Sequence, residues 1–97
     1  MAADRPVALI TGAARRVGAH IARLLHARGF DLALHHRSSA ADMATLVGEL
    51  NSARADSCLV LQGELAEFDR LPELVAHSIG RFGRLDALIN NASAFYP

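Results

Sequence analysis

Two glycines frame a short turn that carries adjacent arginines. The segment reads Thr11-Gly-Ala-Ala-Arg-Arg-Val-Gly18, between a continuous apolar run and a stretch with helical spacing. Gly12 allows a tight turn, and Gly18 allows the helix to pack closely on a sheet. The first turn of a helix presents unpaired N–H groups and a partial positive charge, which suit an anion. The segment therefore predicts a site for a dinucleotide pyrophosphate. A tight turn without a ligand is the alternative interpretation.

A further arginine follows the second apolar run. About 20 positions past the glycine turn, an NAD site usually has an acidic residue that binds the ribose 2′-hydroxyl. This sequence has His36-Arg-Ser-Ser39 there, without a carboxylate. Arg37 can instead pair with a 2′-phosphate through two N–H groups, and Ser38 adds a donor. The pattern predicts NADPH as the cofactor. The alternative is that His35 and His36 merely end a strand and that Arg37 is solvated.

Apolar runs and helical spacing alternate along the chain and position these residues. We expect strands over 7–11, 31–35, 57–62 and 85–90. Helices are expected over 16–28, after a cap at Ser39, and from Asp69 to Gly83. This alternation predicts an α/β fold of the Rossmann type, a doubly wound parallel sheet with right-handed crossovers and strand order 3-2-1-4. The chain supplies the first β-α-β-α-β-α-β half of that fold.

Helical spacing also predicts which side chains each helix buries. The expected apolar face of the first helix comprises Val17, Ile21, Leu24 and Leu25. For the second and third helices, the expected faces are Met43, Leu46, Val47 and Leu50, and then Leu71, Leu74, Val75, Ile79 and Phe82.

Composition excludes several classes of protein. The 97 residues carry ten arginines and ten acidic side chains, and lysine is absent. Zero net charge argues against nucleic acid or an anionic membrane as the main partner. No apolar run approaches the roughly 20 residues of a membrane helix, and residues 1–6 do not resemble a signal peptide. Cys58 is the single cysteine, which suits a reducing compartment, so we expect a cytoplasmic protein. No histidine spacing indicates a metal site.

The glycine turn and the last eight residues together resemble the short-chain dehydrogenase/reductase family. The family pattern is Thr-Gly-x-x-x-Gly-x-Gly, and Arg16 replaces its middle glycine, as in the pteridine reductases of this family. The C-terminal stretch, Asn90-Asn-Ala-Ser-Ala-Phe-Tyr-Pro97, has Ser93 where the family norm Asn-Asn-Ala-Gly has glycine, again as in pteridine reductases. The resemblance covers essentially the whole chain but only the first half of such an enzyme.

This resemblance implies roles for individual residues. Arg16 reaches both the cofactor phosphates and a pterin substrate, Ser93 contacts cofactor and substrate, and Phe95 stacks against the pterin. Glu64 and Leu65 take the place of an Asp-Leu pair that contacts adenine. The complete set of expected cofactor contacts is Gly12, Arg16, Val17, Gly18, His36, Arg37, Ser38, Glu64, Leu65, Asn91, Ala92 and Ser93.

The resemblance also implies that the reaction needs residues from elsewhere. Family members use a Tyr-x-x-x-Lys pair, but this sequence has no lysine, and Tyr96 is followed only by Pro97. We therefore expect no catalytic residue in this chain and no activity of the chain alone. We expect residues 1–97 to form the N-terminal half of one dinucleotide-binding domain, with the remainder of the polypeptide as a second chain in a homo-tetramer. The completed protein is expected to be an NADPH-dependent reductase of a pterin or dihydrofolate-like substrate. The alternatives are a general short-chain ketone reductase and a non-catalytic NADPH-binding fragment.

Overall fold

Strands and helices alternate throughout the computed structural model, which describes residues 5–63 and 70–91. The elements are β1 (Val7–Thr11), α1 (Arg16–Ala27), β2 (Asp31–His36), α2 (Ala40–Ala53), β3 (Cys58–Gln62), α3 (Arg70–Phe82) and β4 (Ala87–Asn90). All strand pairs are parallel, and the order across the sheet is β3-β2-β1-β4. The predicted fold class and strand order are both confirmed.

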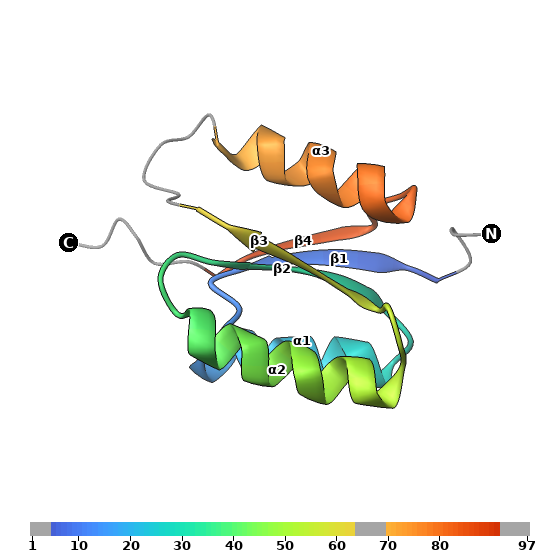
Figure 1. Ribbon diagram of the computed structural model, residues 1–97. Coiled ribbons are helices and arrows are strands. Elements are labelled where there is room, and N and C mark those ends of the chain that lie inside the picture. The colour runs from blue at the N-terminus through green and yellow to red at the C-terminus, as the bar shows by residue number, and fades with distance from the viewer. Residues whose placement is uncertain (1–4, 64–69, 92–97) are drawn as a thin grey trace.

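The sheet lies between two helical layers, with α1 and α2 on one face and α3 on the other (Figure 1). Successive side chains of a strand point to opposite faces, so β1 contributes to both cores. Ala8 and Ile10 pack under α1 and α2, whereas Val7 and Leu9 pack under α3. Because β1 is covered on both faces and paired on both edges, its continuous apolar run is fully buried.

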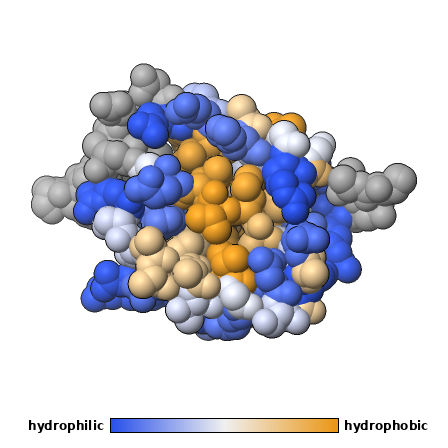
Figure 2. Space-filling view, in the orientation of Figure 1, coloured by the Kyte–Doolittle hydropathy of each residue, from blue (hydrophilic) through white to orange (hydrophobic). Residues whose placement is uncertain are grey.

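The outer edge at β3 is less well covered than the centre of the sheet. Figure 2 shows apolar residues gathered across the middle of this side of the molecule, between α3 and the layer of α1 and α2. Val60 of β3 is 43% exposed there. None of the helices in the described part of the chain has both the length and the apolar character needed to cross a membrane.

The prediction for the buried face of α1 is confirmed for Ile21 and Leu25, which are partly buried against the core, and is wrong for two other residues. Val17 is 61% exposed and Leu24 is 49% exposed. The fully buried residues of α1 are instead Gly18, Ala19, Ala22 and His26. The helix begins directly against the turn that follows β1, so only small side chains fit beneath its first two turns. Spacing alone could not distinguish this close face from the bulkier one beside it.

Two details of the other helices also differ from the prediction. Ile79 of α3 is 45% exposed, and Ser78 is buried. The Ser78 hydroxyl donates to the Leu74 carbonyl of its own helix at 2.8 Å, so burial leaves no polar group unpaired. Ser39 holds the N-cap position of α2, but its side chain makes no capping hydrogen bond.

A buried polar cluster joins α1 to the start of β3. His26 Nε2 lies 2.8 Å from the Ser57 hydroxyl, which is in turn 3.2 Å from the Asn51 side-chain oxygen. His26 itself is buried. Burial is the main cause that lowers the pKa of His26, and the nearby positive charge of Arg54 lowers it further.

This pKa shift predicts that stability falls in mild acid. The unfolded chain, with an ordinary histidine pKa of about 6.5, binds a proton more readily than the folded protein does. The contribution of His26 to the free energy of unfolding is therefore complete above that pH and decreases as the pH falls below it. The limiting slope is about 1.4 kcal/mol per pH unit for one proton.

Denaturant unfolding at several pH values measures this dependence. His26→Gln is expected to flatten the acid-side slope, whereas His77→Gln, a change at an exposed position on α3, leaves it unchanged. Identical slopes for all three proteins would rule out His26 as the responsible group.

Candidate active site

Because the four strands are parallel, their carboxyl ends lie at the same end of the sheet (Figure 1). The candidate residues follow these ends. The β1–α1 turn is at the centre of this end. His36 ends β2 beside it on one side, and Asn91 follows β4 on the other side. In open α/β sheets, ligands bind outside the carboxyl ends of the strands. The topology therefore brings the two predicted anion-binding segments, the turn after β1 and the residues after β2, to the same end of the sheet.

The peptide of Gly12 is held from both sides. Its N–H donates to His35 Nδ1 at 3.1 Å, and its carbonyl accepts from the Asn91 side-chain amide at 3.1 Å. The next N–H, of Ala13, donates to the His35 carbonyl at 2.8 Å. Gly12 has a φ of 62°, in the left-handed region that favours glycine. The turn is thus fixed by contacts to β2 and to the residue after β4.

Gly18 is required by the close approach of α1 to this turn. A methyl group at Gly18 would lie 2.2 Å from the Gly12 carbonyl oxygen, 2.8 Å from the Asn91 amide nitrogen and 2.9 Å from Ala13 Cα. No side chain fits in this space. Because Gly18 has no side chain, the first turn of α1 lies directly against the glycine turn. The N–H groups of this helical turn can then face a phosphate.

Arg16 adopts a backbone conformation that usually belongs to glycine. Its φ is 55°, and it occupies the position of the middle glycine in the family pattern. Its side chain is exposed, and no hydrogen bond or ion pair joins it to another described residue. A cation at a helix N-terminus is unfavourable unless an anion lies nearby. By contrast, Arg15 is paired with Asp42 of α2 at 3.4 Å.

The strained backbone at Arg16 leads to a test of stability. Left-handed φ costs a non-glycine residue about 1–2 kcal/mol. Arg16→Gly is therefore expected to raise the free energy of unfolding by up to about 1 kcal/mol. Asp56→Gly is the matched comparison, because Asp56 has a φ of 58° in the turn before β3, away from the site. Denaturant unfolding that shows a loss of stability for Arg16→Gly and a gain for Asp56→Gly would contradict the assignment of strain to Arg16.

The end of β2 carries the second basic segment. His36 is buried, and its Nδ1 has no hydrogen-bond partner among the described residues. Arg37 and Ser38 are exposed. The segment is anchored to β3, because Gly63 N–H donates to the His36 carbonyl at 3.1 Å and the Gln62 amide donates to the Arg37 carbonyl at 2.8 Å. The exposed guanidinium of Arg37, which follows directly in the sequence, fits a ligand that carries a phosphate.

The remaining predicted residues divide into two groups. Val17 is exposed in the first turn of α1. The Asn91 side-chain amide donates its hydrogen bond to the Gly12 carbonyl. The others lie outside the described residues, so their predicted roles stay predictions: Glu64, Leu65, Ala92, Ser93 and Phe95.

Sequence reasoning missed the contribution of His35, which it treated only as the end of a strand. Its imidazole contacts the turn after β1 and also Gly63 at the end of β3. The available signal was a histidine that continues the apolar run of a buried strand, since a polar side chain there needs partners.

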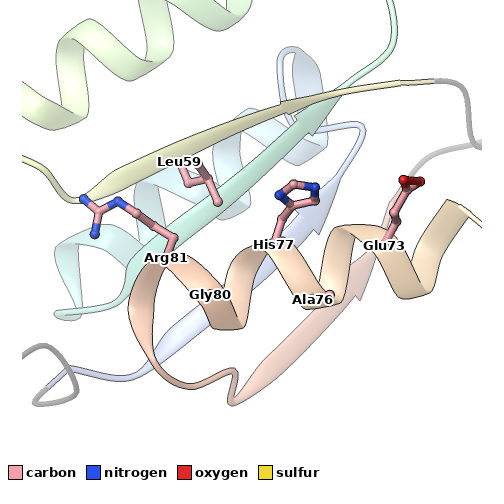
Figure 3. Close-up of a pocket in the computed structure, with 6 residues that line it drawn as sticks. All are labelled: Leu59, Glu73, Ala76, His77, Gly80 and Arg81. Atoms are coloured by element: carbon pink, nitrogen blue, oxygen red, sulfur yellow. The ribbon is translucent and has the colours of Figure 1, made fainter.

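Two hollows accompany these elements. One, of about 340 Å³, lies between the start of α1 and α2 and is bordered by Arg15, Arg16 and Asp42. The other, of about 410 Å³, lies between β3 and α3. Figure 3 shows the side chains of Glu73, His77 and Arg81 spaced along α3 and projecting from it on that side. The second hollow contains none of the predicted site residues. The first hollow is therefore the one that continues the candidate site.

Comparisons with known proteins identify the family. A family model described as short chain dehydrogenase matches residues 6–96. Pteridine reductase 1 of Leishmania tarentolae is 41% identical over 95% of this chain and 38% of its own length. The 3-oxoacyl-(acyl-carrier-protein) reductase FabG of Staphylococcus aureus is 33% identical over 88% of this chain and 34% of its own length. The chain thus spans less than two fifths of the length of these curated relatives.

Proposed function

The chain belongs to the short-chain dehydrogenase family, and on that premise we propose that it forms the cofactor-binding half of an NADPH-dependent pterin reductase. The observation that carries the proposal is the end of β2. There the unpaired Nδ1 of buried His36 precedes Arg37 and Ser38, and no carboxylate is present to bind a ribose hydroxyl. A 2′-phosphate supplies the negative charge that these groups suit.

Each part of the site then has a defined task. The glycine turn and the N-terminus of α1 bind the pyrophosphate, with Val17 and Asn91 beside it. His36, Arg37 and Ser38 hold the 2′-phosphate, and Glu64 and Leu65 border the adenine. Bound NADPH supplies the hydride. The residues of this chain therefore bind and orient the cofactor.

The substrate proposal rests on three residues. Arg16 at the helix N-terminus faces the phosphates and a pterin, Ser93 contacts cofactor and pterin, and Phe95 stacks on the flat ring. The 41% identity to a pteridine reductase supports this assignment. An offset aromatic face suits a heteroaromatic ring. Hydride transfer also needs a proton, which we assign to a Tyr activated by a Lys, both supplied by polypeptide other than this chain.

The assembly and the compartment are further parts of the proposal. We infer a homo-tetramer in which each reductase domain combines residues 1–97 with the remainder of its polypeptide. A cytoplasmic location is supported by the single cysteine, which suits reducing conditions. Cys58 is partly buried, and burial raises the pKa of its thiol, which disfavours the reactive thiolate.

A competition experiment distinguishes the pterin reductase from a general ketone reductase. The second function is favoured by the 33% identity to a 3-oxoacyl-(acyl-carrier-protein) reductase. With the completed protein, we expect NADPH oxidation on addition of dihydrobiopterin and competitive inhibition by methotrexate. Turnover of a 3-oxoacyl thioester without inhibition by methotrexate would favour the ketone reductase. NADPH binding without turnover of either substrate would favour a non-catalytic nucleotide-binding protein.

A further inference from the structure

We propose that His35 is the positioning residue of the dinucleotide site, and that it acts as a neutral imidazole with its proton on Nε2. The inference rests on the proposed function, because it concerns how the fold shapes the site for the cofactor. His35 lies at the carboxyl end of β2, the strand between β1 and β3 in the sheet. It can therefore reach the loops that follow both neighbouring strands.

Two hydrogen-bond partners of the imidazole fix its tautomer. Nδ1 is 3.1 Å from the Gly12 backbone nitrogen, and Nε2 is 2.7 Å from the Gly63 carbonyl oxygen. A backbone N–H only donates and a carbonyl only accepts. Nδ1 must therefore carry the lone pair, and Nε2 must carry the proton. His35 is 2% exposed, so water has little access to replace either partner.

This contact decides which N–H groups are left for a phosphate. Because His35 accepts the Gly12 N–H and its own carbonyl accepts the Ala13 N–H, neither group of the turn is free for a ligand. The pyrophosphate must be bound by N–H groups farther along, in the first turn of α1. The imidazole thus orients the Gly12 peptide and leaves the helix N-terminus as the anion site.

The same side chain couples the two halves of the adenylate pocket. Gly63 directly precedes the Glu64-Leu65 pair that we assign to the adenine. Its carbonyl is held by His35 Nε2, and its N–H is held by the His36 carbonyl. Through one imidazole, Gly63 at the end of β3 is held relative to the glycine turn after β1, although β1 and β3 are not neighbours in the sheet.

Conservative variants separate the two contacts. The Oδ1 atom of an asparagine can take the place of Nδ1 and keep the acceptor for Gly12, whereas the amide nitrogen of a glutamine can take the place of Nε2 and keep the donor for Gly63. Relative to the native protein, we expect His35→Leu to weaken NADPH binding about tenfold or more through loss of both contacts. His35→Asn should restore most of that loss, and His35→Gln should restore less, because the Gly12 peptide borders the phosphate.

The measurement is the dissociation constant for NADPH of the completed protein, taken below the unfolding transition of each variant, with His77→Asn as the surface control. A purely structural histidine would lower the melting temperature of all three variants and leave NADPH affinity unchanged in the folded protein. That result would overturn the inference while leaving NADPH binding intact. Native protein that fails to bind NADPH would instead overturn the proposed function.

A second readout needs no substitution. Nitrogen NMR of imidazole-labelled native protein should show His35 protonated at Nε2 and unprotonated at Nδ1. Observation of the opposite tautomer, or of an imidazolium in the folded protein, would overturn the inference even if every variant failed to fold.

Discussion

Gly18→Ala is expected to lower the free energy of unfolding by about 2–3 kcal/mol, within the usual cost of overpacking. The added methyl group would meet three groups at once, at 2.2 Å from the Gly12 oxygen, 2.8 Å from the Asn91 amide and 2.9 Å from Ala13 Cα. Two of these groups belong to backbone that is itself held by hydrogen bonds, so neither can swing away. The helix must move off the turn, and we expect the proposed phosphate site to be lost together with the stability.

Gly48→Ala is the matched control for this experiment. Gly48 also lies inside a helix, α2, but a methyl group there would contact nothing within 4 Å. Alanine is the better helix former, so this variant is expected to gain about 0.5–1 kcal/mol. Denaturant unfolding of both variants beside the native protein makes the comparison. Similar gains for the two variants would show that α1 does not approach the turn as closely as described.

The second large effect concerns the choice of cofactor. Arg37→Ala should weaken NADPH binding by about 1.5–3 kcal/mol, the usual worth of a hydrogen bond to a charged group. Affinity for NADH should stay nearly unchanged, because NADH has no 2′-phosphate for the guanidinium to pair with. Isothermal titration of the completed protein with each cofactor measures both affinities.

The control for this second experiment is Arg28→Ala. Arg28 is also exposed, but it follows the C-terminal end of α1, at the opposite end of the sheet from the site. Removal of this charge should affect neither cofactor. Equal losses for NADPH and NADH in the Arg37→Ala protein would show that Arg37 does not bind the 2′-phosphate.

The fold could be predicted from the sequence where one physical requirement dominates. A strand buried on both faces must be apolar throughout, and β1 matches its prediction, 7–11. Parallel strands joined by helices leave few possible orders, and the predicted order is the one observed. The faces of α1 were less predictable, because a helix with apolar groups on two sides can bury either. The choice depends on how closely Gly18 lets the helix approach the sheet.

Candidate site residues could be proposed from the sequence where residue type and spacing along the chain are enough. Gly12, Gly18 and Arg37 stand out by residue type and by distance along the sequence. The role of His35 could not be obtained this way. Its imidazole contacts Gly12 and Gly63, which are far apart in the sequence and meet only when three strands align. The left-handed φ of Arg16 is likewise a property of the folded turn.

We propose that the ends of β1 and β2 form one adenylate site that prefers a ligand with a 2′-phosphate. The most direct test is a calorimetric titration of the completed protein with adenosine 2′,5′-bisphosphate and, separately, with adenosine monophosphate. Both ligands lack the nicotinamide half, so they report on the residues of this chain. We expect the bisphosphate to bind at least about tenfold more tightly, a difference of about 1.4 kcal/mol. Equal affinities, or tighter binding of the monophosphate, would show that this site does not recognise a 2′-phosphate.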